Sequence, residues 1–165
     1  MHMDVRHDLP AGITDAWRLL QDDAYRQAQR AHTDTTGEVI SEENCPDGTR
    51  LRRTRVTLGR DLPKVATNLL GERRLAYTLE ENIDDARHRI RWKVIVDRVA
   101  SKVRAEGTFS LEPIDDNTCL RVVTGEIKVS VPLIGSRIEK GIAEDLTRSY
   151  ESTAHFARQW LAEHI

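Results

Sequence analysis

Two carboxylates and one phenol occupy the positions in this sequence that best fit acid–base chemistry. Glu126 follows Gly125, a residue type that marks bulges in strands, where the alternation of apolar residues changes parity. A buried carboxyl has a raised pKa and can act as a general acid or base, whereas an outward one is solvated and pairs with a neighbouring arginine. The outward orientation is favoured for Glu126. Asp145 poses the same alternative on a helix, and either carboxyl would need a polar partner such as Tyr77.

The sequence patterns that mark other kinds of reactive site are absent. The six histidines are scattered, and they form no zinc-binding pattern with each other or with the cysteines. The sequence contains no nucleophile elbow, P-loop or dinucleotide-binding glycine motif. We therefore predict no metal and no cofactor. Cys45 and Cys119 are predicted to be free thiols.

Positive charge gathers over one predicted strand, which carries Arg50, Arg52, Arg53 and Arg55. Such a cluster is typical of a solvated sheet edge, where charge discourages edge-to-edge aggregation. A second interpretation is a clamp for an anionic headgroup at the mouth of a cavity, or transient contact with acidic lipid at a membrane surface. The sequence leaves open whether these arginines bind anything.

Composition places the chain among folded proteins of moderate size. Its 165 residues are 39% hydrophobic and carry a formal net charge of -2, so we expect one domain over residues 1–165. The near-neutral charge argues against nucleic acid as a partner. No apolar stretch approaches the ~20 residues of a membrane span, and the first residues lack a signal-peptide pattern. These observations predict a cytoplasmic protein; they indicate nothing about its oligomeric state.

Hydrophobic periodicity predicts the elements that would position these residues. A strand over 3–9 precedes two short helices, over 13–20 and 22–31. Apolar residues then alternate with period two, and turn residues separate the runs, which indicates an antiparallel sheet. The predicted strands of this second part are 34–43, 48–59, 72–81, 86–98, 103–113 and 117–131. A single long helix is predicted from about 133 to 163.

The long helix is expected to cover the apolar face of this sheet. Its predicted buried stripe becomes small or polar in the middle, at Asp145, Ser149 and Thr153, before it reaches Phe156. Protein interiors are closely packed, so the space beside small residues must be filled by other side chains, water or a ligand. Aromatic residues make up only 5% of the chain, which leaves few large side chains for this purpose.

The order of elements resembles the helix-grip fold of the START-like, or SRPBCC, superfamily. Segments 107–113 and 125–140, with Gly-Glu-Ile-Lys-Val, Val-Pro-Leu-Ile-Gly and Ile-Glu-Lys, are similar to a bacterial branch known only as a domain of unknown function. The resemblance implies an α+β fold: a curved antiparallel seven-stranded sheet wrapped on a long C-terminal helix, with two short helices after the first strand. It also implies a cavity for apolar molecules between sheet and helix. The superfamily includes lipid carriers, hormone receptors, polyketide cyclases and chaperone co-factors, so it does not imply one activity.

We therefore predict binding or transport of an apolar or amphipathic, lipid-like small molecule, with no reaction required. Apolar walls would supply affinity and a few polar groups orientation. The predicted lining consists of Tyr77, Trp92, Val94, Phe109, Ile142, Leu146, Ser149 and Thr153. Two alternatives remain: a cyclase or dehydratase-type enzyme that uses Glu126 or Asp145 with Tyr77, and a protein-interaction module with a vestigial cavity.

One connection is unusually apolar for a loop, the one over residues 62–71. It is either a cap on the sheet edge or a portal flap that faces the start of the long helix. The predicted portal consists of Leu62, Val65, Leu69, Leu70, Leu133 and Ile134.

Overall fold

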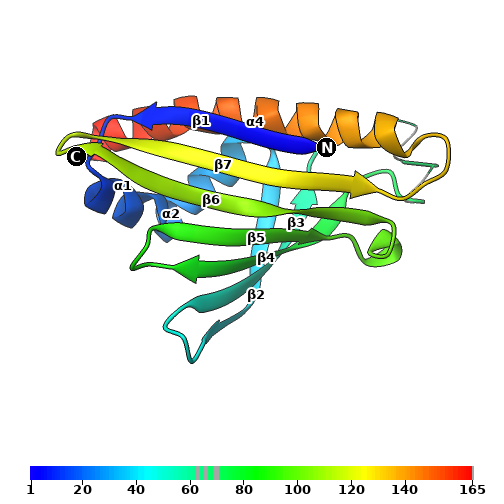
Figure 1. Cartoon of the computed structure of the whole chain (residues 1–165), viewed down its shortest axis with the longest axis horizontal. Coiled ribbons are helices and arrows are strands. Elements are labelled where there is room, and N and C mark those ends of the chain that lie inside the picture. The colour runs from blue at the N-terminus through cyan, green and yellow to red at the C-terminus, as the bar shows by residue number, and fades with distance from the viewer. Residues whose placement is uncertain (62–63, 65–66, 69–70, 165) are drawn as a thin grey trace.

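The computed structural model of the chain is a seven-stranded antiparallel sheet that curves around a long last helix (Figure 1). The structure describes residues 1–61, 64, 67–68 and 71–164. Its strands are β1 His2–Leu9, β2 Thr35–Asn44, β3 Arg50–Leu58, β4 Ala76–Asp84, β5 Arg89–Ile95, β6 Val103–Asp115 and β7 Thr118–Val129. Its helices are α1 Ile13–Leu20, α2 Asp23–His32, the short 3-10 helix η1 Asp97–Val99 and α4 Gly135–His164. The α+β helix-grip prediction is confirmed.

The strand order is β1-β7-β6-β5-β4-β3-β2. From β2 to β7 each strand pairs with the next along the chain, as the short turn-rich separators predict for all but the longer connection between β3 and β4. The first strand returns to pair with the last, so β1 and β2 form the two edges of the sheet. The arginine-rich strand β3 lies between β2 and β4. Its interpretation as a solvated edge is therefore wrong.

The turn between β4 and β5 lies three residues later than predicted, over 85–88 instead of 82–85. Asn82, Ile83 and Asp84 extend β4 instead of forming the turn, and Ile83 lies opposite Ile90 in β5. The remaining turn ends in His88, which adopts a left-handed backbone with φ 52°. Both isoleucines are buried, so extending β4 places Ile83 in the core opposite Ile90.

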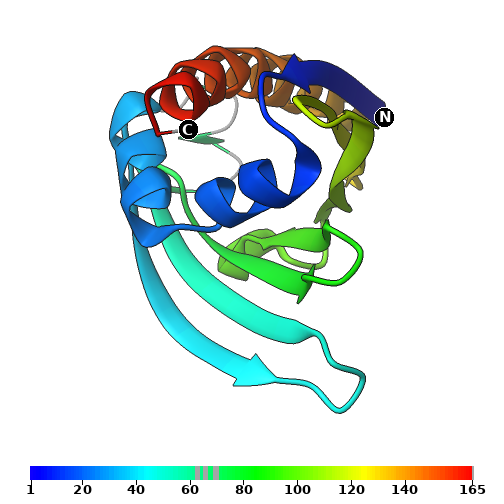
Figure 2. The same ribbon diagram turned by 90° about the vertical axis from the view of Figure 1, so that its left-hand side faces the viewer.

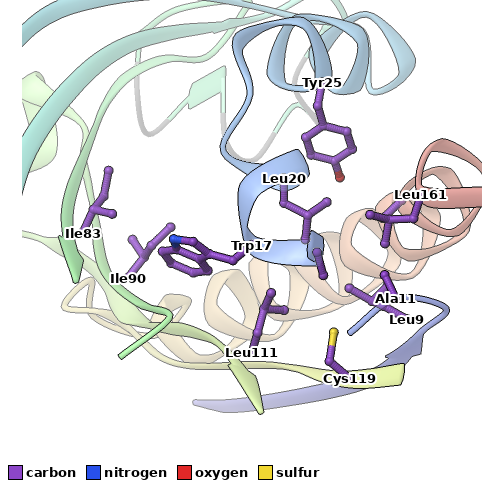
Figure 3. Packing of buried hydrophobic residues seen from close by; sticks show 12 residues of the cluster. Leu9, Ala11, Trp17, Leu20, Tyr25, Ile83, Ile90, Leu111, Cys119 and Leu161 are labelled. Carbon is purple, nitrogen blue, oxygen red and sulfur yellow. The ribbon is translucent and has the colours of Figure 1, made fainter. Parts of the chain in front are cut away.

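The two short helices lie on the same side of the sheet as α4. Figure 2 shows α1 and α2 beneath the C-terminal part of α4, within the curve of the sheet. Trp17 and Leu20 of α1 and Tyr25 of α2 join one buried apolar cluster with Leu161 of α4 (Figure 3). A second cluster packs β1, β5, β6 and β7 against the first half of α4. These helices close one end of the space under α4.

The buried face of α4 agrees with the predicted stripe at Thr153 and differs from it elsewhere. Ala143, Ala154, Ala157 and Leu161 are buried, whereas Phe156 is only partly buried and packs against Tyr25 of α2. Small alanines let the helix approach β1 and β7 closely, and the aromatic side chains therefore lie to the side of this contact. Periodicity alone could not separate these two faces of one helix.

Cys45 and Cys119 are free thiols, as predicted. Among the residues that the structure describes, no helix is long and apolar enough to cross a membrane.

Candidate functional site

A cavity of about 230 Å³ lies between the sheet, the two short helices and α4. Figure 3 shows part of its surroundings, where Leu20 and Tyr25 approach from the short helices and Ile90 from the sheet. The cavity is lined by Leu20, Gln21, Tyr25, Arg26, Gln29, Arg52, Tyr77, Leu79, Glu81, Ile90, Trp92, Val94, Phe109, Arg121, Leu146 and Tyr150. Apolar side chains are thus mixed with tyrosines and charged groups.

Part of the predicted lining lies at this cavity. The residues that do are Tyr77, Trp92, Val94, Phe109 and Leu146. Ile142, Ser149 and Thr153 are not among the lining residues. Ile142 packs against the second apolar cluster, and Thr153 faces β7, where it bonds Arg121. One turn after Leu146, α4 presents Tyr150 to the cavity instead, because a spacing of four continues this face of the helix.

Trp92 forms one wall of the cavity over a pair of glycines. It lies opposite Gly107 in β6, which in turn lies opposite Gly125 in β7. A Cβ atom at Gly125 would lie 2.8 Å from Cζ2 of Trp92, so the missing side chain makes room for the indole ring. The indole Nε1 is buried and has no hydrogen-bond partner among the described residues.

Three tyrosines bring hydroxyl groups to the cavity. Burial raises the pKa of Tyr25 and of Tyr150 to about 12, and it also raises the pKa of Tyr77. All three phenols therefore stay protonated at neutral pH and can donate. In the part of the chain that the structure describes, no hydrogen bond engages these hydroxyls.

Two of the lining residues form an ion pair between adjacent strands. Arg52 of β3 lies opposite Glu81 of β4, and Nη2 of the arginine is 3.1 Å from Oε1 of the glutamate. Their side chains are only 4% and 14% exposed. Burial of such a pair is tolerated because each charge neutralises the other.

The other arginines of β3 also have carboxylate partners. Arg50 binds Asp85 and Glu42, Arg53 binds Glu80, and Arg55 binds Asp97. The arginine cluster of the sequence is therefore a set of ion pairs rather than a patch of unbalanced positive charge.

Arg121 is a buried cation on the face of β7 that points toward α4. Its Nη2 donates to the backbone oxygen of Tyr150 at 2.6 Å and lies 3.2 Å from Nδ1 of His7, while its Nη1 donates to Oγ1 of Thr153 at 3.3 Å. Burial is the main cause that lowers the pKa of this guanidinium. No carboxylate among the described residues forms an ion pair with it.

Sequence reasoning missed Arg121, although a signal was present. Apolar side chains alternate along β7, and Cys119, Val123 and Ile127 are fully buried. Arg121 has the same parity, so this arginine stands on the apolar face of its strand. A charged residue in phase with buried ones is a mark of a functional interior.

Glu126 lies outward, the orientation favoured from the sequence, and the alternative acid–base pair with Tyr77 does not form. The side chain of Glu126 is 66% exposed and lies 2.7 Å from Nδ1 of His2, and that of Asp145 is 50% exposed and pairs with Arg148. Neither carboxylate lines the cavity that Tyr77 lines. β7 runs through Gly125 in unbroken register with β6, so no bulge turns Glu126 inward. The carboxylate at the cavity is Glu81 instead.

Most of the predicted portal lies outside the described residues, namely Leu62, Val65, Leu69 and Leu70. The other two members lie at the start of α4. Leu133 is fully exposed with a left-handed φ of 72°, and Ile134 is also exposed. Within the described ranges, no three His, Cys, Asp or Glu side chains lie close enough together to hold a metal ion.

Comparison with known proteins supports the fold. A family model described as "Protein of unknown function (DUF2505)" matches residues 4–161. No curated protein sequence matches the chain.

Solved structures resemble the chain over nearly its whole length. The protein TTHA0849 from Thermus thermophilus has a TM-score of 0.70 at 17% identity, with 99% of this chain and 98% of that chain covered. The Zhui aromatase/cyclase from Streptomyces sp. R1128 has a TM-score of 0.69 at 17% identity, covering 98% and 93%. A START superfamily protein from Mycobacterium smegmatis has a TM-score of 0.62 at 14% identity, covering 96% and 97%. At these identities the similarity shows the fold.

Proposed function

From the premise that this chain belongs to the DUF2505 family and has a START-like fold, we propose that it binds an amphipathic small molecule between its sheet and α4. Solved structures of this fold include a START superfamily protein and an aromatase/cyclase, which is consistent with a site for a hydrophobic ligand. The fold alone does not select between binding and catalysis.

The observation that carries the proposal is the mixed lining of the cavity. Trp92, Val94, Phe109 and Leu146 offer apolar contact, which stabilises a bound molecule by roughly 25 cal/mol per Å² of buried area. The indole Nε1 is a buried donor without a partner, which costs about 1–3 kcal/mol unless water or a ligand accepts from it. An apolar body with a polar group satisfies both parts of this lining.

The volume sets the size of the ligand. Benzene occupies an apolar cavity of about 150 Å³ in a well-studied case, and drug-sized ligands occupy about 300–1,000 Å³. A cavity of about 230 Å³ lies between these values. We propose a molecule of one or two rings, or of comparable chain length, rather than a lipid with two acyl chains.

The enzyme alternative has less support. Its predicted carboxylates, Glu126 and Asp145, lie outside the cavity, and the carboxylate that lines it, Glu81, is held by Arg52. Oε1 of Glu81 already accepts from Nε and Nη2 of Arg52, so this oxygen is engaged within the protein. We therefore propose binding without a chemical step.

Titration with 2-naphthamide, a neutral two-ring probe, tests this proposal by calorimetry and by the indole signals of a ¹H–¹⁵N spectrum. We expect saturable binding that shifts the Trp92 indole signal. Leu146→Trp should weaken binding at least about tenfold, because the larger ring occupies the cavity. Ile114→Trp, at an exposed position of β6, is the matched control and should bind as the parent does. Absence of binding to the parent, or equal binding by Leu146→Trp, would contradict the proposal.

A further inference from the structure

Arg121 lies between the two apolar clusters of the interior. Cys119 and Leu111 belong to the cluster on one side, and Val123 and Ile127 to the cluster on the other. The arginine itself is only 2% exposed, and it lines the cavity. Arg121 thus places a charged group within an otherwise apolar contact between β7 and α4.

The hydrogen bonds of this guanidinium are incomplete. An arginine carries five N–H groups. The structure uses three of them, toward the backbone oxygen of Tyr150, Oγ1 of Thr153 and Nδ1 of His7. The Nε atom is buried without a partner among the described residues. All three acceptors are neutral groups when His7 is unprotonated.

Among the residues that the structure describes, no negative charge compensates that of Arg121. The nearby cation Arg158 repels it, and the phenols of Tyr25 and Tyr150 are neutral at pH 7. Taking an unpaired ion out of water costs several kcal/mol even after relaxation. A protein that needed only a packed core at this position would place an apolar residue there, as it does at Val123. The cation is therefore explained by a negative charge that arrives from outside the chain.

We propose that the ligand of the cavity is an organic carboxylate on an apolar body, and that its oxyanion binds Arg121. Tyr25 and Tyr150 donate their hydroxyls to the same group, and Trp92 and Phe109 contact the apolar body. This inference rests on the proposed function and adds the charge of the ligand to it. Arg121 is almost fully buried, so the attraction between the two charges is stronger than at the surface.

The other arginines at the cavity fit this role less well. Arg52 is already neutralised by Glu81 at 3.1 Å. Arg26 has a carboxylate partner in Asp23, 3.4 Å away on the same helix. The carboxylate is therefore expected at the Arg121 end of the cavity.

A matched pair of probes tests the charge preference. We compare 2-naphthoate with 2-naphthamide, which has nearly the same shape and no charge, at pH 7.5 by calorimetry. The parent protein should bind the anion at least about tenfold more tightly than the amide, because hydrogen bonds to charged groups are the stronger ones. Binding of both probes with equal affinity overturns the inference and leaves the proposed function intact. Binding of neither probe overturns both.

Variants locate the preference. Arg121→Met should remove the preference for the anion while it still binds the amide, which also shows that the variant is folded. Arg104→Met removes the same charge from an exposed position of β6 and should retain the preference. If Arg121→Met does not fold, Tyr150→Phe replaces it, and a preference about threefold or more below that of the parent is expected from the loss of one donor. A preference unchanged in the folded Arg121→Met or in Tyr150→Phe refutes the assignment.

Discussion

Gly125→Ala is the substitution that most directly tests how the cavity wall is built. The added Cβ would lie 2.8 Å from Cζ2 and 2.9 Å from Cη2 of Trp92, where ordinary contacts are 3.4–4 Å. The backbone cannot retreat, because Gly125 is paired with Met3 on one side and with Gly107 on the other. The indole must therefore move away by about 0.6 Å, toward the cavity that it lines.

Two effects set the size of the change. Overpacking a filled site costs about 1–3 kcal/mol, and replacing glycine in an extended strand returns about 0.4–1 kcal/mol through the unfolded state. The indole has a cavity to move into, which keeps the cost below the upper limit. We expect the free energy of unfolding to fall by about 1–2 kcal/mol, and the affinity for 2-naphthamide to fall severalfold.

Urea unfolding followed by tryptophan fluorescence measures the first quantity and calorimetry the second. Alanine substitutions at two other glycines serve as controls, one without a clash and one with a severe clash. Gly141→Ala meets no atom within 4 Å on α4 and should stabilise the protein by up to about 1 kcal/mol. Gly107→Ala places Cβ against the backbone oxygen of Thr124 and should prevent stable folding. A Gly125→Ala protein as stable as the parent would refute the packing argument, and a destabilised one with full affinity would refute the position of Trp92 at the ligand.

Three further predictions follow from buried groups. Glu81→Gln leaves Arg52 buried without its partner and should cost about 3–5 kcal/mol in urea unfolding, whereas Glu80→Gln on the opposite face should cost about 1 kcal/mol or less; equal costs would contradict the burial argument. Burial, and then the neighbouring guanidinium, lower the pKa of His7, so the unfolded chain binds the proton more readily. The contribution of His7 to the free energy of unfolding should therefore be fully present above the ordinary pKa of about 6.5 and should be lost as the pH falls below it. In His7→Gln the free energy of unfolding should depend less on pH between about pH 7 and 5, and an identical pH dependence would exclude His7 as the titrating group. Burial raises the pKa of the Cys119 thiol to about 11, so in the native protein Cys45 should react with Ellman's reagent and Cys119 should not. Both thiols should react in urea, and rapid reaction of two thiols in the native protein would contradict this expectation.

Much of the fold could be predicted from the sequence, because each strand and helix carries its own periodicity. The strands over 3–9 and 103–113 and the first helix lie where apolar alternation or helical spacing predicts them. The end of β4 could not be placed, since Asn82 and Asp84 are typical turn residues that the tertiary pairing with β5 holds in a strand.

The site was harder to predict than the fold. Apolar lining residues such as Trp92 and Val94 follow from the parity of one strand. Polar ones such as Arg121 and Tyr150 belong to elements far apart in the chain, and only the pairing of β7 beneath α4 brings them together. Glu126 has the outward orientation that the sequence favours, but the inward alternative is excluded only by the unbroken register of β7 with β6, which the sequence does not reveal.

The pairing of β1 with β7 has a consequence for how the chain matures on the ribosome. Leu9 finds its partner only at Cys119, and His2 only at Glu126, so the first strand emerges more than a hundred residues before its neighbour. During that interval Met3, Val5 and Leu9, which end up buried, have no sheet to join. Local hairpins from β2 onward can form during synthesis. The pairing of β1 with β7 and the packing of α4 on the sheet must await the end of translation. The nascent N-terminal strand is therefore the segment for which a chaperone would have the longest time to act.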